Sequence, residues 1–180
     1  MQKVIRPLAL LAGGLALAVG PAVAQAPAGH AAHAAAAPLD PALAAKVKEV
    51  AAATAQFRDF EAARAAGYAH QQPVGCIEAA EGAQGYHWLN PDLVDTTVDP
   101  LEPELLMYEP QADGSMQLIG VDYIVPIAQW TAAEPPTLFD MPLGRNEKLE
   151  VFAIHIWTER PNPSGTFAMF NPAVSCKYAK

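Results

Sequence analysis

The sequence of 180 residues is poor in cysteine, in basic residues and in recognisable catalytic motifs. It contains no Gly-x-Ser-x-Gly elbow, no glycine loop of the phosphate-binding kind, no His-Glu-x-x-His pair and no haem-attaching Cys-x-x-Cys-His segment. These absences argue against a hydrolase that uses a covalent serine or cysteine nucleophile.

The first apolar run is too short to cross a membrane. It extends from Pro7 to Val19, about 13 residues against the roughly 20 that span a bilayer. Lys3 and Arg6 precede it, and the small residues Ala22-Val23-Ala24 follow. This layout predicts a secretory signal peptide over residues 1–24, and therefore a periplasmic or secreted protein with no membrane span after cleavage.

Basic residues are few. The chain has 11 Lys and Arg against 19 Asp and Glu, and loss of Lys3 and Arg6 with the signal peptide brings the net charge to about −10. Nucleic acids and anionic lipid surfaces would repel such a protein. Metal ions, cationic ligands or basic proteins are the partners that the charge favours.

Cys76 and Cys176 are the two cysteines, and both lie beyond the signal peptide. In an exported protein this predicts a disulfide between them. The alternative, a pair of thiolate metal ligands, has no closely spaced Cys/His pattern to support it.

Residues 25–38 consist almost entirely of Ala, Pro and Gly with two histidines, and we expect a flexible leader. His30 and His33 could bind copper or nickel loosely, or be chance members of an Ala-rich tail. Residues 39–180 are expected to form a single domain. Asp40-Pro41 predicts the start of one amphipathic helix to about Ala66, with Gly67 as its C-terminal cap.

Beyond Gly85 the pattern changes to short strands separated by turn residues. The hairpin signal Asp113-Gly114 makes two of the strands antiparallel neighbours. The sequence therefore predicts an α+β domain in which a long N-terminal helix packs on a curved antiparallel sheet of about four strands. Long Pro-rich loops, chiefly 130–146, would cover the other face. The expected strands are 85–89, 105–109, 116–125 and 149–158.

Two histidines in similar contexts are the first candidates for a functional site. His87 in Gly-Tyr-His-Trp and His155 in Ile-His-Ile-Trp would meet on one face if their strands paired. Together they could ligate a metal or act as acid and base. The alternative is a pair of buried histidines that satisfy backbone carbonyls or carboxylates.

Carboxylates near these histidines supply further candidates. Glu104, with His87 and His155, would make a set of two histidines and one carboxylate that suits zinc, iron or copper. Asp122 lies in an apolar strand, where an unpaired carboxylate is costly, so it must reach solvent or have a partner. Tyr123, Glu104 and the two histidines are also the expected polar lining of a ligand cavity.

A set of segments spread along the chain forms a recognisable pattern: 57–68, Cys76, Gly85-Tyr86-His87, the run Pro103 to Pro110, Leu118 to Tyr123, His155-Ile156-Trp157, and 162–167 through 171–176. These segments are similar to those of a family of small exported bacterial proteins for which no activity is established. The resemblance covers nearly all of the expected mature domain. It implies one intact domain and adds no mechanism.

Three hypotheses from different classes remain open at this point. The first is a disulfide-stapled domain that binds a small ligand between sheet and loops. The second is a metal-dependent enzyme or metal-binding protein that uses His87, His155 and a carboxylate. The third is a structural or interaction protein of the cell envelope. The sequence decides neither the oligomeric state nor whether the protein is an enzyme.

Overall fold

The computed structural model describes residues 37–180. The predicted signal peptide and nearly all of the predicted leader, with His30 and His33, lie outside the described residues. Within the described range, no helix is both long enough and apolar enough to span a bilayer.

The N-terminal helical segment begins where the sequence predicts. Helix α1 spans Pro41–Thr54, and the Asp40 side chain accepts hydrogen bonds from the backbone N–H groups of Ala42 and Leu43. Asp40 therefore satisfies donors that the first turn leaves unpaired, while Pro41 has no N–H to satisfy.

The prediction of one continuous helix to Ala66 is wrong. A 3₁₀ turn, η1 (Ala55–Arg58), follows α1, and a separate helix, α2, spans Phe60–Ala65. The break lies at Asp59, whose backbone is extended and whose side chain accepts from the N–H groups of Glu61 and Ala62. Aspartate competes with the backbone in this way, so it favours a new helix start over a helix interior.

Gly67 ends the helical segment, as expected. Its φ of +104° is a conformation that side chains rarely adopt. The N–H groups of Gly67 and Tyr68 donate to the carbonyls of Arg64 and Ala63. This pair of bonds is a Schellman motif, and it turns the chain toward the sheet.

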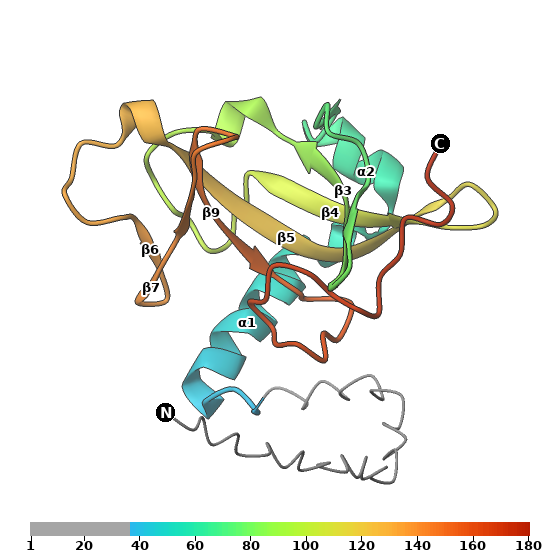
Figure 1. Ribbon diagram of the computed structural model, residues 1–180, viewed down its shortest axis with the longest axis horizontal. Helices are drawn as coiled ribbons and strands as arrows, with labels where there is room; N and C mark the ends of the chain where they lie inside the picture. Colours follow the sequence, from blue (N-terminus) through green and yellow to red (C-terminus); the bar gives the residue numbers. More distant parts are fainter. Residues whose placement is uncertain (1–36) are drawn as a thin grey trace, which may run out of the picture. The chain divides into compact units, whose positions relative to one another are not determined.

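The main sheet is antiparallel and has seven strands, more than the four or so that the sequence predicts. Its strands β3, β4, β5 and β9 are labelled in Figure 1. Its order is β1-β3-β4-β5-β9-β8, and β2 pairs with β3 beside this path. The additional strands are two or three residues long, too short to give a periodic signal. The bounds are β1 His70–Gln71, β2 Ile77–Ala79, β3 Gly82–Leu89, β4 Leu105–Pro110, β5 Met116–Pro126, β8 Gly144–Asn146 and β9 Val151–Ile156.

The connections between strands carry short elements of their own. The predicted covering loop 130–146 contains β8 and a small second sheet of β6 (Thr137–Leu138) and β7 (Met141–Pro142). Two 3₁₀ turns, η2 (Pro91–Leu93) and η3 (Ile127–Gln129), lie after β3 and β5. The turn at Asp113-Gly114 joins β4 to β5 as predicted.

The two faces of the sheet have different roles. The helical segment covers one face, where Val50 and Ala63 pack with Leu106, Val121 and other strand residues in the main core. On the opposite face, Met107 packs with Trp157 and Val174 of the segment after β9. That C-terminal segment crosses the sheet (Figure 1) and leaves part of this second face uncovered.

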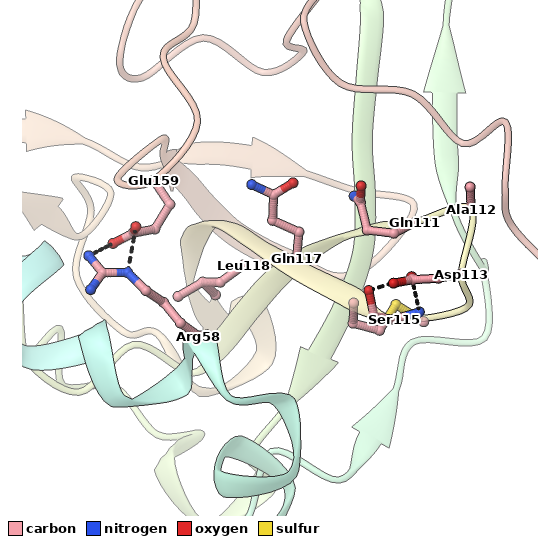
Figure 2. Close-up of a pocket in the computed structure, with 9 residues that line it drawn as sticks. Arg58, Gln111, Ala112, Asp113, Ser115, Gln117, Leu118 and Glu159 are labelled. Atoms are coloured by element: carbon pink, nitrogen blue, oxygen red, sulfur yellow. Dashed lines mark hydrogen bonds and ion pairs between the residues drawn. The ribbon is translucent and has the colours of Figure 1, made fainter.

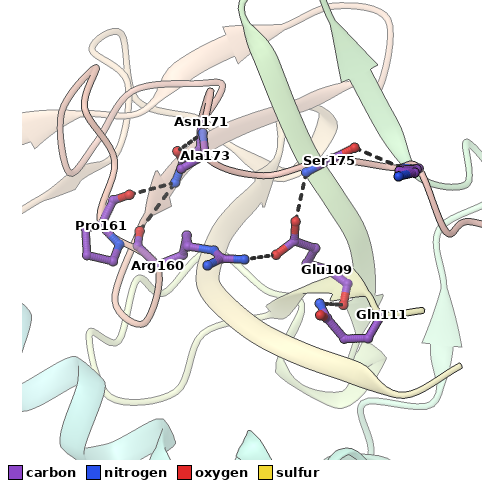
Figure 3. A network of polar contacts seen from close by, with 8 residues as sticks. Glu109, Gln111, Arg160, Pro161, Asn171, Ala173 and Ser175 are labelled. Atoms are coloured by element: carbon purple, nitrogen blue, oxygen red, sulfur yellow. Dashed lines mark hydrogen bonds and ion pairs between the residues drawn. The ribbon is translucent and has the colours of Figure 1, made fainter. Parts of the chain in front are cut away.

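Covalent and ionic contacts hold the C-terminal segment against the sheet. Cys76 and Cys176 form the predicted disulfide, which closes a sequence separation of 100 residues. The buried Glu109 pairs with Arg160 and accepts from the Ser175 N–H at 2.9 Å (Figure 3). The fully buried Asn171 donates to the carbonyls of Arg160 and Pro161 (Figure 3).

We expect the double substitution Cys76→Ser/Cys176→Ser to lower the free energy of unfolding by about 4 to 5 kcal/mol. Opening a loop of 100 residues restores conformational entropy to the unfolded chain. Denaturant unfolding of the variant and of the oxidised wild type measures the difference, and reduced wild-type protein is the control. A loss below about 1 kcal/mol would contradict this expectation.

Candidate metal centre

His87, Asp122 and His155 reach the second face of the sheet from three different strands. Asp122 in β5 is the register partner of His155 in β9, so their side chains lie on the same face. Leu105 in β4 pairs with both Asp122 and Leu89. Because side chains alternate along a strand, His87, two residues before Leu89 in β3, shares that face.

The two histidines meet across intervening strands, without the pairing of their own strands that was the condition for a meeting in the sequence-based hypothesis. Strands β4 and β5 lie between β3 and β9. In a flat sheet, three interstrand spacings would hold the backbones of β3 and β9 about 14 Å apart. Each imidazole spans part of that distance, and the two Nε2 atoms are 3.4 Å apart. The face that carries them is hollowed by a cavity that both histidines line, and the side chains converge toward one point.

Three potential ligand atoms form a compact triangle. Nε2 of His155 lies 3.5 Å from Oδ2 of Asp122, Nε2 of His87 lies 3.9 Å from the same oxygen, and the two Nε2 atoms are 3.4 Å apart. The circle through three atoms with these separations has a radius of about 2.1 Å. Bonds from zinc to imidazole nitrogen or carboxylate oxygen are about 2.0 to 2.2 Å long. An ion at the centre of the triangle would thus contact all three atoms at bonding distance.

The backbone fixes the orientation of the His155 ring. Its Nδ1 lies 3.1 Å from the carbonyl oxygen of Met169. A carbonyl can only accept, so Nδ1 carries the proton and donates it. In the neutral ring, Nε2 then presents its lone pair to the triangle. Metal-ligating histidines commonly have such a hydrogen bond on the second ring nitrogen.

Burial leaves some polar atoms of the cluster without partners. His87 is 4% exposed and Asp122 is 5% exposed. Among the described residues, Nδ1 of His87 and Oδ1 of Asp122 have no hydrogen-bond partner. Unpaired buried polar atoms are rare in folded proteins and costly, so they call for a specific explanation. Neither atom belongs to the triangle, but a cation at its centre would compensate the charge of the buried Asp122 carboxylate.

The two histidines differ in their affinity for a proton. Burial, followed by repulsion from His155, lowers the pKa of His87 to about 4. Burial alone would also lower the pKa of His155, but the charge and hydrogen bonding of Asp122 outweigh it, and the pKa of His155 is raised. At neutral pH, His87 is therefore a neutral imidazole, the form that binds metals.

The cluster forms the floor of a cavity of about 570 Å³ on the concave face. This volume lies within the range of small-molecule sites. The walls are largely apolar and include Leu105, Ile124 and Phe167. Gln72, Gln84 and Asn146 add neutral polar groups, and Arg145 and Glu147 pair with each other at its edge.

The other residues that the sequence analysis selected lie elsewhere. Glu104 is not part of the cluster: its Oε2 accepts a hydrogen bond from the Ile124 N–H at 3.1 Å. Tyr123 is fully buried in the main core and donates from its hydroxyl to the Pro100 carbonyl. The structure places Asp122, rather than Glu104, beside the two histidines. One feature of the sequence did point to Asp122: it is a carboxylate in an apolar strand, and such a group needs a partner.

A second cavity, of about 610 Å³, lies beside the β4–β5 turn (Figure 2). Its charged and polar side chains bond to one another. Arg58 makes two hydrogen bonds to Glu159, and Asp113 accepts from the backbone and hydroxyl of Ser115 (Figure 2). These groups are already satisfied, which makes this cavity the weaker candidate.

The chain matches no protein-family model, no curated protein and no solved structure. The resemblance to a family of small exported bacterial proteins stays a prediction.

Glu104 makes stability depend on pH. Burial raises its pKa from 4.5 to about 7. Because the folded state holds the proton more tightly than the unfolded chain, this contribution is fully present below about pH 4.5 and is lost as the pH rises through about 7. We expect Glu104→Gln to be more stable than wild type by about 1 to 3 kcal/mol at pH 8 and similar to it at pH 4.5.

Urea denaturation at the two pH values measures this difference. The glutamine oxygen can still accept the Ile124 N–H, so the substitution removes only the charge. Glu102→Gln, two residues away and exposed, is the matched control and should leave the pH dependence unchanged. An unaltered pH dependence in Glu104→Gln would contradict the assignment.

Proposed function

We propose that this protein binds one zinc ion through Nε2 of His87, Nε2 of His155 and Oδ2 of Asp122, and that the ion binds a small molecule in the cavity above it. The observation that carries the proposal is the triangle of ligand atoms, whose centre lies about 2.1 Å from each of them. The hydrogen bond from His155 to the Met169 carbonyl supports it.

The donor set favours zinc over hard cations. Two imidazole nitrogens and one carboxylate oxygen suit zinc, whereas magnesium and calcium require mainly oxygen ligands. In a tetrahedral zinc site the ligand atoms are about 3.3 to 3.4 Å apart. Two of the three separations, 3.4 and 3.5 Å, already lie near that value. A small movement of His87 toward Asp122 would complete the geometry.

Three protein ligands leave a coordination position open, and the cavity gives a small molecule access to it. Structural zinc sites are commonly closed by four protein ligands. Among the described residues, the metal-ligand group contains three members. The open position is the reason to propose a ligand-binding role over a purely structural one.

The residues that line the cavity favour binding over catalysis. A zinc ion with an open position can activate water, which would suit a hydrolase. Such an enzyme commonly needs a second acid–base group near the metal. Among the described residues that line the cavity, the further carboxylate is Glu147, which is exposed and paired with Arg145. We therefore favour binding, with metal-dependent hydrolysis as the second candidate.

The disulfide supports a location outside the cytoplasm, where such bonds persist. We propose that the protein works in the periplasm or is secreted, in agreement with the predicted signal peptide. The acidic composition adds an attractive field for cations in that compartment. A role as a structural envelope protein is less favoured because a filled core, without the 570 Å³ cavity, would be expected.

Metal analysis of the mature protein tests the proposal. We expect about one equivalent of zinc after dialysis of the untagged protein, and a loss of at least 100-fold in zinc affinity in His87→Ala, His155→Ala and Asp122→Asn. His70→Ala is the matched control because His70 is exposed on β1 and outside the cluster. A version that begins at Pro38 removes His30 and His33.

Circular dichroism and thermal unfolding of each variant show whether the fold persists. Zinc that binds equally to His70→Ala and His87→Ala would contradict the proposal. Zinc that disappears when the chain begins at Pro38 would also contradict it, because the leader histidines would then be the ligands.

A further inference from the structure

Apolar side chains remain exposed at the mouth of the cavity. Val74, Leu149 and Met169 are 47%, 47% and 64% exposed, and all three line the cavity. They come from three separate segments: the loop before β2, the residues before β9, and the C-terminal segment. Exposed apolar groups that gather around one opening mark a binding surface more often than single exposed residues do.

The polarity of the cavity changes from its floor to its mouth. The floor holds His87, Asp122 and His155, and the walls above it are mainly aliphatic and aromatic. With zinc bound, one carboxylate and two neutral imidazoles would give the floor a net charge of about +1. A ligand that fits must therefore have an anionic metal-binding head and an apolar body.

Resting on the proposed zinc site, we propose that the ligand is an amphiphilic monoanion, a medium-chain carboxylate or a compound of the same chemistry. Its head binds the open position of the zinc ion, and its chain lies against Ile124 and Phe167. The chain ends at the rim of Val74, Leu149 and Met169. The charged residues at the edge do not compete for the head, because Arg145 and Glu147 neutralise each other.

Three probes separate the contributions of head and chain. Octanoate has both, acetate has the head alone, and 1-octanol has the chain with a neutral head. Each buried methylene strengthens binding about fourfold. If three of the six additional carbons are buried, octanoate should bind the zinc-loaded protein about 50-fold more tightly than acetate. Octanol, and octanoate with the chelator-treated protein, should bind at least tenfold more weakly than octanoate with the zinc-loaded protein.

Leu149→Ser tests the rim. We expect about a fivefold weaker affinity for octanoate and an unchanged affinity for zinc, because Leu149 contacts the chain of the ligand and lies outside the metal-ligand group. Leu101→Ser is the matched control: Leu101 is 51% exposed and does not line the cavity. It should bind octanoate as the wild type does. Both substitutions are at exposed positions, so the fold should tolerate them.

Isothermal titration calorimetry measures all of these affinities, and zinc is titrated first. Zinc binding with equal affinities for octanoate and acetate overturns this inference and leaves the zinc site standing. Octanoate binding that does not depend on zinc overturns the head-group assignment. Failure to bind zinc at all overturns the proposed function. A dimer in sedimentation velocity that Leu149→Ser abolishes, without octanoate binding, would make a second copy of the chain the occupant.

Discussion

A carboxylate buried in the middle of an apolar strand is the constraint on which the rest of this structure depends. Asp122 is 5% exposed, and its neighbours Val121 and Tyr123 are fully buried in the main core. A carboxylate at such a position is costly unless positive charge or hydrogen bonds compensate it. Two imidazoles turn toward it from β3 and β9, and their Nε2 atoms, together with Oδ2 of Asp122, define a place for a cation.

The fold makes this convergence possible through the curvature of the sheet. The helical segment covers one face and packs against the strand residues of the main core. The opposite, concave face brings strands β3 and β9 within reach of a common point although two strands separate them. The unfavourable free energy of burying polar side chains is thus confined to one site. The large apolar core on the other face stabilises the domain.

The C-terminal segment completes the site. It provides the Met169 carbonyl that orients His155, and it places Phe167 and Met169 in the cavity wall. The disulfide holds this segment to the sheet, and so does the Glu109–Arg160 pair (Figure 3). Contacts that are remote from the cluster therefore hold the Met169 carbonyl in place, and through it they set the orientation of His155 Nε2, the nitrogen that a metal would bind.

Local signals in the sequence predicted much of the fold. Asp40-Pro41, Asp113-Gly114 and Gly67 act through their own backbone and side-chain chemistry, and each lies where it was expected. The short strands β1, β2 and β8 escaped prediction because two or three residues show no periodicity.

Residue type and similar local contexts selected the two histidines, but which side chains meet depends on the whole sheet. Register and curvature decide that Asp122 joins them and that Glu104 turns to the Ile124 N–H. No short-range pattern contains that information. The apolar rim was equally hidden, because Val74, Leu149 and Met169 are brought together from three distant parts of the chain.

Anomalous diffraction from crystals of the zinc-loaded mature protein is the decisive test of the zinc site. Data on the two sides of the zinc absorption edge locate the ion without assumptions about its ligands. We expect one strong peak on the concave face, about 2.1 Å from Nε2 of His87, Nε2 of His155 and Oδ2 of Asp122. A protein that binds zinc elsewhere and has no peak at this triangle would contradict the proposed zinc site.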